Sequence, residues 1–242
     1  MVWLNGDTHI GQKRQSNQDV FLAELIGDNA LMVVCDGMGG EQGGETASRL
    51  ALETASNMLK RDVKEGMEEK TIQRIMECAV AAANSVVYET ASLDIDLKGM
   101  GTTLTAAVVE QNVAHFAHIG DSRAYLLRDD FLSQLTVDHT VAQMLINSGQ
   151  KTAEEMVGDP RNNSLVRAVG VQPEMRSDIF SIDVIKGDAI LLCSDGLYNY
   201  LSHEELCALT SIAIKMRSIA SLIDRANENG GGDNITAVIC VI

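Results

Sequence analysis

Apolar runs that stop abruptly at an aspartate recur along this sequence. The run 30–35 is followed at once by Asp36, and the run 189–193 leads into a Ser-Asp-Gly triplet with Asp195 at its centre. One such junction is ordinary, because aspartate and glycine are common turn residues. Several such junctions constrain the fold, because strand ends that lie side by side would bring their carboxylates close together.

Three further aspartates occupy comparable positions. Asp121 follows the run 115–119, Asp233 precedes the last apolar run, and Asp19 follows a polar stretch. If these ends converge, like charges ~4–5 Å apart cost about 3–4 kcal/mol per pair at an effective dielectric constant of 20. Either the carboxyl pKa values rise or a cation neutralises the cluster.

The donor set favours a hard divalent cation. Carboxylates and glycine carbonyls, with no cysteine or histidine beside them, select Mg²⁺ or Mn²⁺ rather than Zn²⁺. Two such ions can hold a shared water as hydroxide for in-line attack on phosphorus. Arg14 would supply the planar, two-pronged contact that a phosphate accepts. The sequence therefore suggests a binuclear site for phosphoester chemistry.

Periodicity favours an α+β layered sandwich over a doubly wound parallel sheet. Helical spacing of apolar residues marks two long segments, a shorter one between Asp138 and Gly149, and a pair within 203–228. The long helices are expected at 43–60 and 71–90, and the strands at 30–35, 102–109, 113–119, 123–128, 179–184, 188–193 and 235–242. Short links between consecutive strands permit antiparallel pairing and leave no room for crossover helices. No linker is evident, so residues 1–242 are expected to form a single domain.

Charge and composition narrow the cellular setting. There are 34 acidic and 19 basic residues, a net charge of −15, which disfavours nucleic acids and anionic membranes as partners. No apolar run approaches the roughly 20 residues of a membrane span. The N-terminus lacks a signal-peptide pattern, and the five cysteines lack paired spacing. A cytoplasmic protein in a reducing compartment is expected.

Two nucleotide-binding patterns fail on inspection. The glycine-rich stretch 37–43 follows a strand and opens a helix, but Gln42 stands at the third glycine position of a dinucleotide fingerprint. No Gly-x-x-x-x-Gly-Lys-Ser/Thr motif is present, which argues against a P-loop nucleotidase.

Six short motifs together resemble the metal-dependent type 2C (PPM family) serine/threonine protein phosphatases, in their compact bacterial branch. In family order they are Arg14-x-x-Asn17-Gln18-Asp19, Asp36-Gly37-Met38-Gly39-Gly40, Gly99-Met100-Gly101-Thr102-Thr103, Gly120-Asp121-Ser122-Arg123, Cys193-Ser194-Asp195-Gly196 and Asp233-Asn234-Ile235-Thr236. The resemblance implies a four-layer α-β-β-α sandwich, with two antiparallel central sheets flanked by helix pairs. It also implies a mobile flap at about 138–168, beside the site, in which substrate choice would lie.

The resemblance assigns the metal ligands. It implies two Mn²⁺ or Mg²⁺ ions bridged by Asp36, with the Gly37 carbonyl on one ion and Asp195 and Asp233 on the other. Asp121, together with Asp195, matches a third and weaker metal site.

Further residues surround those ligands in the family pattern. Asp19 would hold metal-bound waters from outside the ligand shell, with Gln18 beside it, and Arg14 would bind the phosphate. Thr102 and Asn234 stand in motifs that line the site, where packing or turn support is an equally good explanation.

The implied reaction is hydrolysis of phosphoserine or phosphothreonine by direct attack of a metal-bridging hydroxide. Two alternatives stay open at this point: a metal-dependent phosphoesterase of small molecules, and a non-catalytic relative that binds phosphoproteins. The implied partners are phosphorylated proteins, among them a membrane-anchored serine/threonine kinase and its targets. We expect a monomer that takes part in bacterial signalling.

Two departures from the family pattern leave the general acid open. Glu41 and Asp159 stand where the bacterial pattern often carries histidine. Of the remaining histidines, His139 is expected at a helix start, and His115 and His118 are expected within a sheet. A metal-bound water is the other possible proton donor for the leaving alkoxide.

Overall fold

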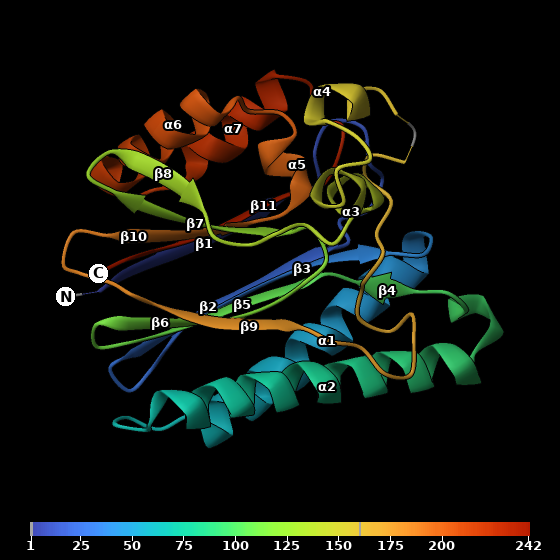
Figure 1. The fold of residues 1–242 in the computed structure, drawn as a ribbon, viewed down its shortest axis with the longest axis horizontal. Helices are drawn as coiled ribbons and strands as arrows, with labels where there is room; N and C mark the ends of the chain where they lie inside the picture. The colour runs from blue at the N-terminus through green and yellow to red at the C-terminus, as the bar shows by residue number, and fades with distance from the viewer. Residues whose placement is uncertain (1, 160) are drawn as a thin grey trace.

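Two antiparallel sheets lie face to face in the middle of the molecule (Figure 1). The computed structural model describes residues 2–159 and 161–242, apart from the side chain of Glu41. The first sheet has the strand order β1-β11-β10-β7-β8. Its strands are β1 (Trp3–His9), β11 (Ile235–Val241), β10 (Ala189–Cys193), β7 (Arg123–Arg128) and β8 (Phe131–Gln134).

The second sheet has the order β2-β3-β5-β6-β9, and a short strand, β4, pairs with β3. Its strands are β2 (Asp19–Ile26), β3 (Asn29–Met38), β4 (Gly101–Thr102), β5 (Leu104–Glu110), β6 (Val113–Ile119) and β9 (Asp178–Asp183). Every pairing between named strands in the two sheets is antiparallel. The predicted antiparallel α+β arrangement is therefore confirmed.

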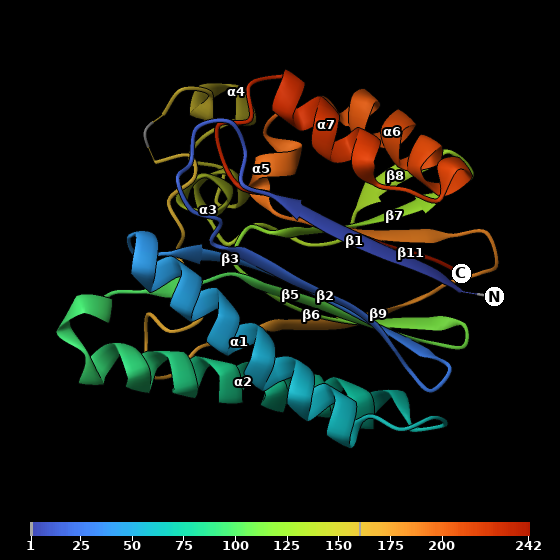
Figure 2. The same cartoon turned by 180° about the vertical axis from the view of Figure 1, so that it is seen from behind.

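Helix pairs cover the outer faces of the sheets, which gives four layers (Figures 1 and 2). On the second sheet lie α1 (Glu41–Asp62) and α2 (Glu69–Leu93), and on the first lie α6 (His203–Met216) and α7 (Ala220–Glu228). The remaining helices are short: η1 (Ile95–Leu97), α3 (Val141–Asn147), α4 (Ala153–Met156) and α5 (Asp195–Tyr198). Among the described residues, no helix has both the length and the apolar character needed to cross a membrane.

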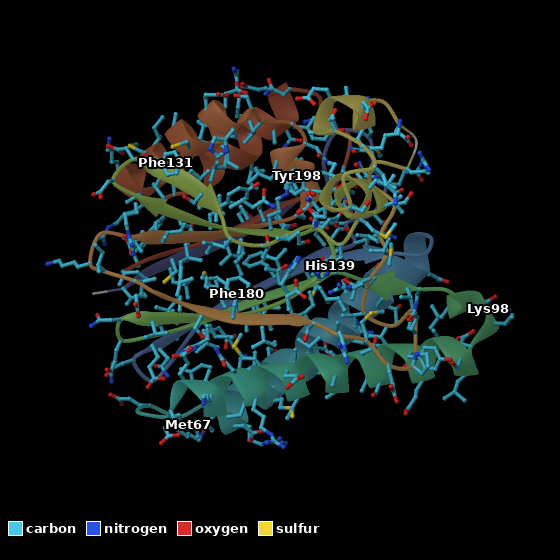
Figure 3. All side chains as sticks on the ribbon, viewed as in Figure 1. Met67, Lys98, Phe131, His139, Phe180 and Tyr198 are labelled. Atoms are coloured by element: carbon cyan, nitrogen blue, oxygen red, sulfur yellow. The ribbon has the colours of Figure 1, made fainter. Side chains whose placement is uncertain are left out.

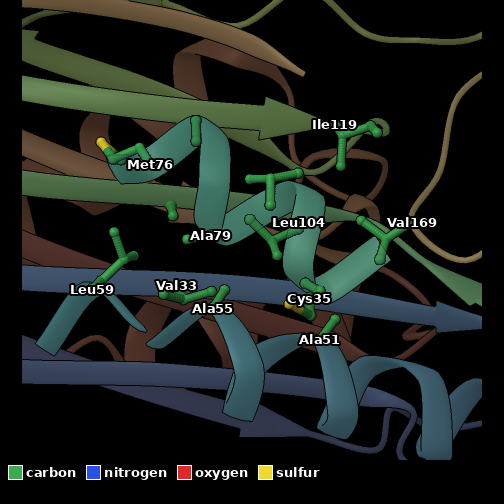
Figure 4. Packing of buried hydrophobic residues seen from close by; sticks show 14 of the residues in the cluster. Val33, Cys35, Ala51, Ala55, Leu59, Met76, Ala79, Leu104, Ile119 and Val169 are labelled. Carbon is green, nitrogen blue, oxygen red and sulfur yellow. The ribbon is translucent and has the colours of Figure 1, made fainter. Parts of the chain in front are cut away.

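Each interface between layers has its own apolar core. Under α1 and α2, Leu59 and Met76 pack against Val33 and Leu104 of the sheet (Figure 4). Between the sheets, the rings of Phe116 and Phe180 stack with centroids 4.9 Å apart; Phe180 is labelled in Figure 3. These apolar layers anchor the strands, so that strand ends at the sheet edge are held in fixed positions.

Three strands were not expected from the sequence. In the segments that form β1, β2 and β8, apolar and polar residues alternate only weakly. Several of their side chains are half-buried or exposed, so these strands need no regular apolar face. Strand β3 also extends past its predicted end, because Gly37 and Met38 pair with β4. Asp36 therefore lies within a strand rather than in a turn after it.

The segment between α1 and α2 is largely exposed, but Val63 is buried. This residue is 1% exposed and packs into the core under α1. The helix predicted after Asp138 is confirmed as α3, but its N-cap is Thr140, whose side chain accepts a hydrogen bond from the Gln143 N–H. Asp138 forms an ion pair with Arg123 instead.

Candidate functional site

A cavity of about 430 Å³ opens at the edge where strands from both sheets end. The carboxylates of Asp36, Asp121, Asp195 and Asp233 line it, together with Arg14. These residues lie as far apart as positions 14 and 233 in the chain, and the fold brings them to one place.

Each acidic side chain is positioned by a defined piece of backbone. In the β2–β3 register, Asp19 stands opposite Asp36. Asp195 is the first residue of α5 and is separated from β10 by Ser194, and Asp233 lies just before β11. Asp121 lies in the turn between β6 and β7, and its carbonyl accepts a hydrogen bond from Tyr198 Oη at 3.0 Å.

Two glycines allow the backbone segments beneath the cavity to approach closely. A Cβ at Gly37 would collide with the Gly44 carbonyl, and a Cβ at Gly196 would collide with the Asn234 carbonyl. Because backbone atoms cannot move aside as a flexible side chain can, we expect that no other residue fits at either position. The glycines that follow Asp36 and Asp195 are thus required for the close packing of these backbone segments.

The carboxylates in the cavity disfavour one another's charge. Burial raises the pKa of Asp36 well above its usual value, and the charges of Asp19, Asp195, Asp121 and Asp233 raise it further. Burial followed by the charges of Asp121 and Asp233 raises the pKa of Asp195. A cluster of this kind requires either protons or a cation.

Asp19 is buried behind these residues, with 3% of its surface exposed. Its Oδ2 accepts a hydrogen bond from Ser194 Oγ at 2.6 Å. Its Oδ1 is buried and has no hydrogen-bond partner among the described residues. Burial raises the pKa of Asp19, and hydrogen bonds from Ser194 and Thr236 oppose that rise. An unpaired carboxylate oxygen beside a strongly acidic cavity suits a hydrated cation.

The donors fit a magnesium-like ion rather than a cage built wholly of protein. Within the part of the chain that the structure describes, no three His, Cys, Asp or Glu side chains already lie close enough to share one ion, so three carboxylates that hold one ion would have to draw together around it. Mg²⁺ characteristically keeps several waters and takes one or two carboxylates. Carboxylates with a glycine carbonyl beside them match this coordination preference.

Arg14 brings positive charge to the cavity. Its Nη2 donates a hydrogen bond to Asp233 Oδ2 at 2.7 Å, and half of its side-chain surface is exposed. The hydrogen bond to Asp233 raises the pKa of Arg14, as do the charges of Asp36 and Asp195, while burial opposes the rise. Since a guanidinium has five N–H donors, an arginine held in this way can still contact an anion in the cavity.

The residues for which the sequence left two explanations have supporting roles. Thr102 Oγ1 donates a hydrogen bond to the Asp36 carbonyl at 2.8 Å. Asn234 donates to the carbonyls of Ile10 and Ser16, and its Oδ1 accepts from the Gln18 N–H at 2.8 Å. Asn234 thereby holds the loop that carries the phosphate-binding candidate.

Sequence reasoning missed several residues at the site. Thr103 lines the cavity, and its Oγ1 accepts a hydrogen bond from the Asp36 N–H at 2.9 Å. Asn163 and Leu165 reach the cavity from the segment 138–168, which we call the flap. The Gly-Thr-Thr motif pointed to this region, and Asn163 stands at the asparagine of the family's His-Pro-x-x-Asn element, whereas no pattern singled out Leu165.

The histidines lie away from the cavity. His115 and His118 are buried sheet residues, as predicted, and burial lowers the pKa of each. His139 (labelled in Figure 3) accepts a hydrogen bond from the Gly120 N–H at 3.1 Å, and its Nε2 lies 3.1 Å from Asp178 Oδ2. No histidine is among the described residues that line the cavity.

Glu41 and Asp159 stand where the family pattern often carries histidine, and only Asp159 has a side chain that the structure describes. The side chain of Glu41 and the residue Pro160 lie outside the described residues. Asp159 forms an ion pair with Arg161 at 2.8 Å, and hydrogen bonds from Arg161 lower the pKa of that carboxyl. A lowered pKa makes Asp159 a poor proton donor, and Asp159 is not among the described residues that line the cavity, so the structure gives no support for an acid role at this position.

Comparisons with known proteins agree with this geometry. The family model described as Protein phosphatase 2C matches residues 5–233. The serine/threonine phosphatase stp of Listeria innocua is 34% identical over 236 residues, covering 96% of this chain and 92% of its own length. The phosphatase PstP of Mycobacterium tuberculosis is 36% identical over 229 residues, which span 95% of this chain and 43% of the longer relative.

Solved structures show the same fold. The S. agalactiae serine/threonine phosphatase superposes with a TM-score of 0.91 at 30% identity, and the match covers 100% of both chains. The catalytic domain of PstP, solved in complex with 2 manganese ions, gives a TM-score of 0.86 at 35% identity and covers 100% of this chain and 99% of its own. With a family match over nearly its whole length and relatives above 30% identity, this chain belongs to the protein phosphatase 2C family.

Proposed function

We propose that this protein is a metal-dependent phosphatase that hydrolyses phosphoserine and phosphothreonine in proteins. The observation that carries the proposal is the convergence of four carboxylates and Arg14 on one cavity. Family membership and the serine/threonine phosphatase names of relatives that cover most of the chain support it.

The ligand assignment belongs to the proposal. Asp36 and the Gly37 carbonyl would hold one ion, and Asp36, Asp195 and Asp233 the other; Asp121 with Asp195 would hold a third, weaker one. The convergence of these residues on one cavity supports the assignment. Bound Mn²⁺ or Mg²⁺ lowers the pKa of coordinated water and offsets the charge of a phosphate.

The protein's own groups then have separate tasks. The Arg14 guanidinium binds and orients the phosphate, and its bond to Asp233 keeps it directed at the cavity. Asn234 holds the loop that carries Arg14. Because burial and neighbouring charge raise the pKa of Asp121 to about 7, that carboxyl can hold or release a proton near neutral pH in the metal-free site.

Substrate class is the first test of this proposal. A phosphothreonine peptide, a phosphoserine peptide and a panel of nucleotides are compared at equal concentration with Mn²⁺. We expect the peptides to have the higher kcat/KM, because Asn163 and Leu165 of the flap can contact residues beside the phosphate. Faster hydrolysis of nucleotides would instead favour a small-molecule phosphoesterase.

Metal binding should stabilise the fold markedly. A ligand at 100 times its Kd contributes about 2.7 kcal/mol to the free energy of unfolding. In a domain of this size that corresponds to a rise in Tm of roughly 5–10 °C. Thermal unfolding with and without millimolar Mn²⁺ measures it, and NaCl at equal ionic strength controls for screening. An unchanged Tm would contradict the metal-site assignment and favour a non-catalytic relative.

The wider setting is proposed by analogy. We propose a single domain over residues 1–242, with the flap moving beside the site, and a monomer that acts in the bacterial cytoplasm. Its partners would be phosphorylated proteins, including a serine/threonine kinase and that kinase's targets. The names of the bacterial relatives support the substrate class.

A further inference from the structure

A buried serine hydroxyl joins the two sheets beside the cavity. Ser194 directly follows β10 of the first sheet, and its Oγ donates to Asp19 Oδ2 at the start of β2 in the second, at 2.6 Å. The two residues are 175 positions apart in the sequence, and Ser194 is fully buried. Ser194 also directly precedes Asp195 in the chain. It therefore adjoins Asp195 in the first sheet's segment and is hydrogen-bonded to Asp19 in the second sheet.

A third residue also binds the Ser194 hydroxyl. Ser194 Oγ accepts a hydrogen bond from the Thr236 N–H at 3.0 Å, and the Ser194 N–H donates to the Thr236 carbonyl at 3.1 Å. A hydroxyl has one proton to donate. Because an ionised carboxylate can only accept, the Ser194 proton goes to Asp19, while the Thr236 N–H holds the hydroxyl oxygen from the other side.

Asp19 in turn lies beside Asp36, behind the residues that line the cavity. The two residues are paired in the register of β2 and β3. Since Ser194 binds Oδ2, the second oxygen, Oδ1, is left buried and without a described partner. Ser194 therefore occupies one carboxylate oxygen of Asp19, and the other oxygen can accept a further hydrogen bond.

We propose that Ser194 is a positioning residue for the metal centre and acts through Asp19. Its hydroxyl fixes the Asp19 carboxylate, so that Oδ1 can accept a hydrogen bond from the hydration shell of an ion held by Asp36. The inference rests on the proposed metal-dependent function. Groups that orient ligands from outside the first shell typically change metal affinity by about 10–100-fold when mutated.

A purely structural role makes a different prediction. If the hydroxyl merely joined the sheets, Ser194→Ala would lower the free energy of unfolding and leave metal affinity unchanged. If it acts through Asp19, its effect on affinity should disappear once that carboxylate is gone. A double-mutant cycle between the two residues separates the two roles.

Calorimetric titration of the full chain with Mn²⁺ alone tests the inference. We expect Ser194→Ala to weaken binding by about tenfold, and Ser194→Thr, which keeps the hydroxyl, to stay near wild type. Ser56→Ala removes a similarly buried hydroxyl in α1 and should leave Mn²⁺ affinity unchanged. In an Asp19→Asn background, Ser194→Ala should change affinity by less than about twofold.

Two results would overturn the inference. One is wild-type affinity in Ser194→Ala; the other is a full tenfold loss that persists in the Asp19→Asn background. If the alanine variant does not fold, Ser194→Cys carries the same comparison, because a thiol is a weaker donor of similar shape. If the wild-type chain does not bind millimolar Mn²⁺, both the proposed function and the inference are wrong. If the wild type binds Mn²⁺ and only the variants depart from expectation, the inference alone is wrong.

Discussion

Replacing Asp36 by asparagine should lower kcat/KM for a phosphothreonine peptide by about a thousandfold or more. Asp36 is the carboxylate on which the charges of four neighbouring aspartates act, and it is proposed to bridge both ions. Metal ions supply several kcal/mol of transition-state stabilisation, and each ~1.4 kcal/mol corresponds to a factor of ten in rate. Steady-state kinetics with saturating Mn²⁺ measures the loss.

The stability of the same variant shows whether a loss of activity reflects misfolding. Burial and the neighbouring carboxylates raise the Asp36 pKa, so at neutral pH its charge opposes folding of the metal-free chain. An asparagine at this position carries no charge, and metal-free Asp36→Asn should therefore unfold at the same temperature as wild type or higher. The Tm of the metal-free variant should therefore be unchanged or higher, while its kcat/KM falls.

A buried aspartate outside the cavity provides the matched control. Burial alone would raise the Asp188 pKa, but hydrogen bonds from Arg128 and the Ile185 N–H outweigh it and lower that pKa. Its charge stabilises the fold, so Asp188→Asn should lower Tm and leave kcat/KM near wild type. If Asp36→Asn kept wild-type activity, the metal-site assignment would be wrong.

Replacing Arg14 by alanine should have the second-largest effect. Removing one preorganised donor to a developing negative charge typically costs about 2.7–4 kcal/mol, or about 10²–10³ in rate. The half-exposed guanidinium is directed at the cavity by its bond to Asp233, so we expect a loss of that size in kcat/KM. The measurement is phosphopeptide hydrolysis with saturating Mn²⁺.

Two comparisons separate the shape of Arg14 from its charge. Arg14→Lys keeps the charge but loses the planar fork, so it should recover a minor part of the activity. Arg61→Ala removes an exposed arginine paired with Asp62 at the end of α1 and should have no effect. An unchanged kcat/KM in Arg14→Ala would show that this side chain does not contact the phosphate.

Local pattern was sufficient for much of the fold. The long helices repeat apolar residues on one face, and strands such as β5 and β10 are buried along their whole length, so their apolar runs stand out. Strand β1 was missed because it is an edge strand with half-buried and exposed side chains. Its backbone is held by pairing with β11 at the other end of the chain, a contact that no local pattern reports.

Sequence identified the acids of the site more readily than the residues that hold them. Asp36 and Asp195 interrupt apolar runs, which is a local signal. Ser194 and Thr103 have no such signal, because their importance lies in hydrogen bonds to Asp19 and Asp36 from distant strands. The two flap residues at the cavity depend on how the flap folds back toward the strand ends.

The sequence by itself determined the antiparallel α+β class, the family and the identity of the acidic residues, because each is written in short stretches of adjacent residues. Tertiary structure alone decided that the strand ends meet at one cavity, that Asp19 keeps one buried oxygen without a partner among the described residues, and that the described cavity lining holds no histidine. The physical reason is that pKa values and hydrogen-bond partners depend on distances in space. Those distances are set when two separate sheets pack together.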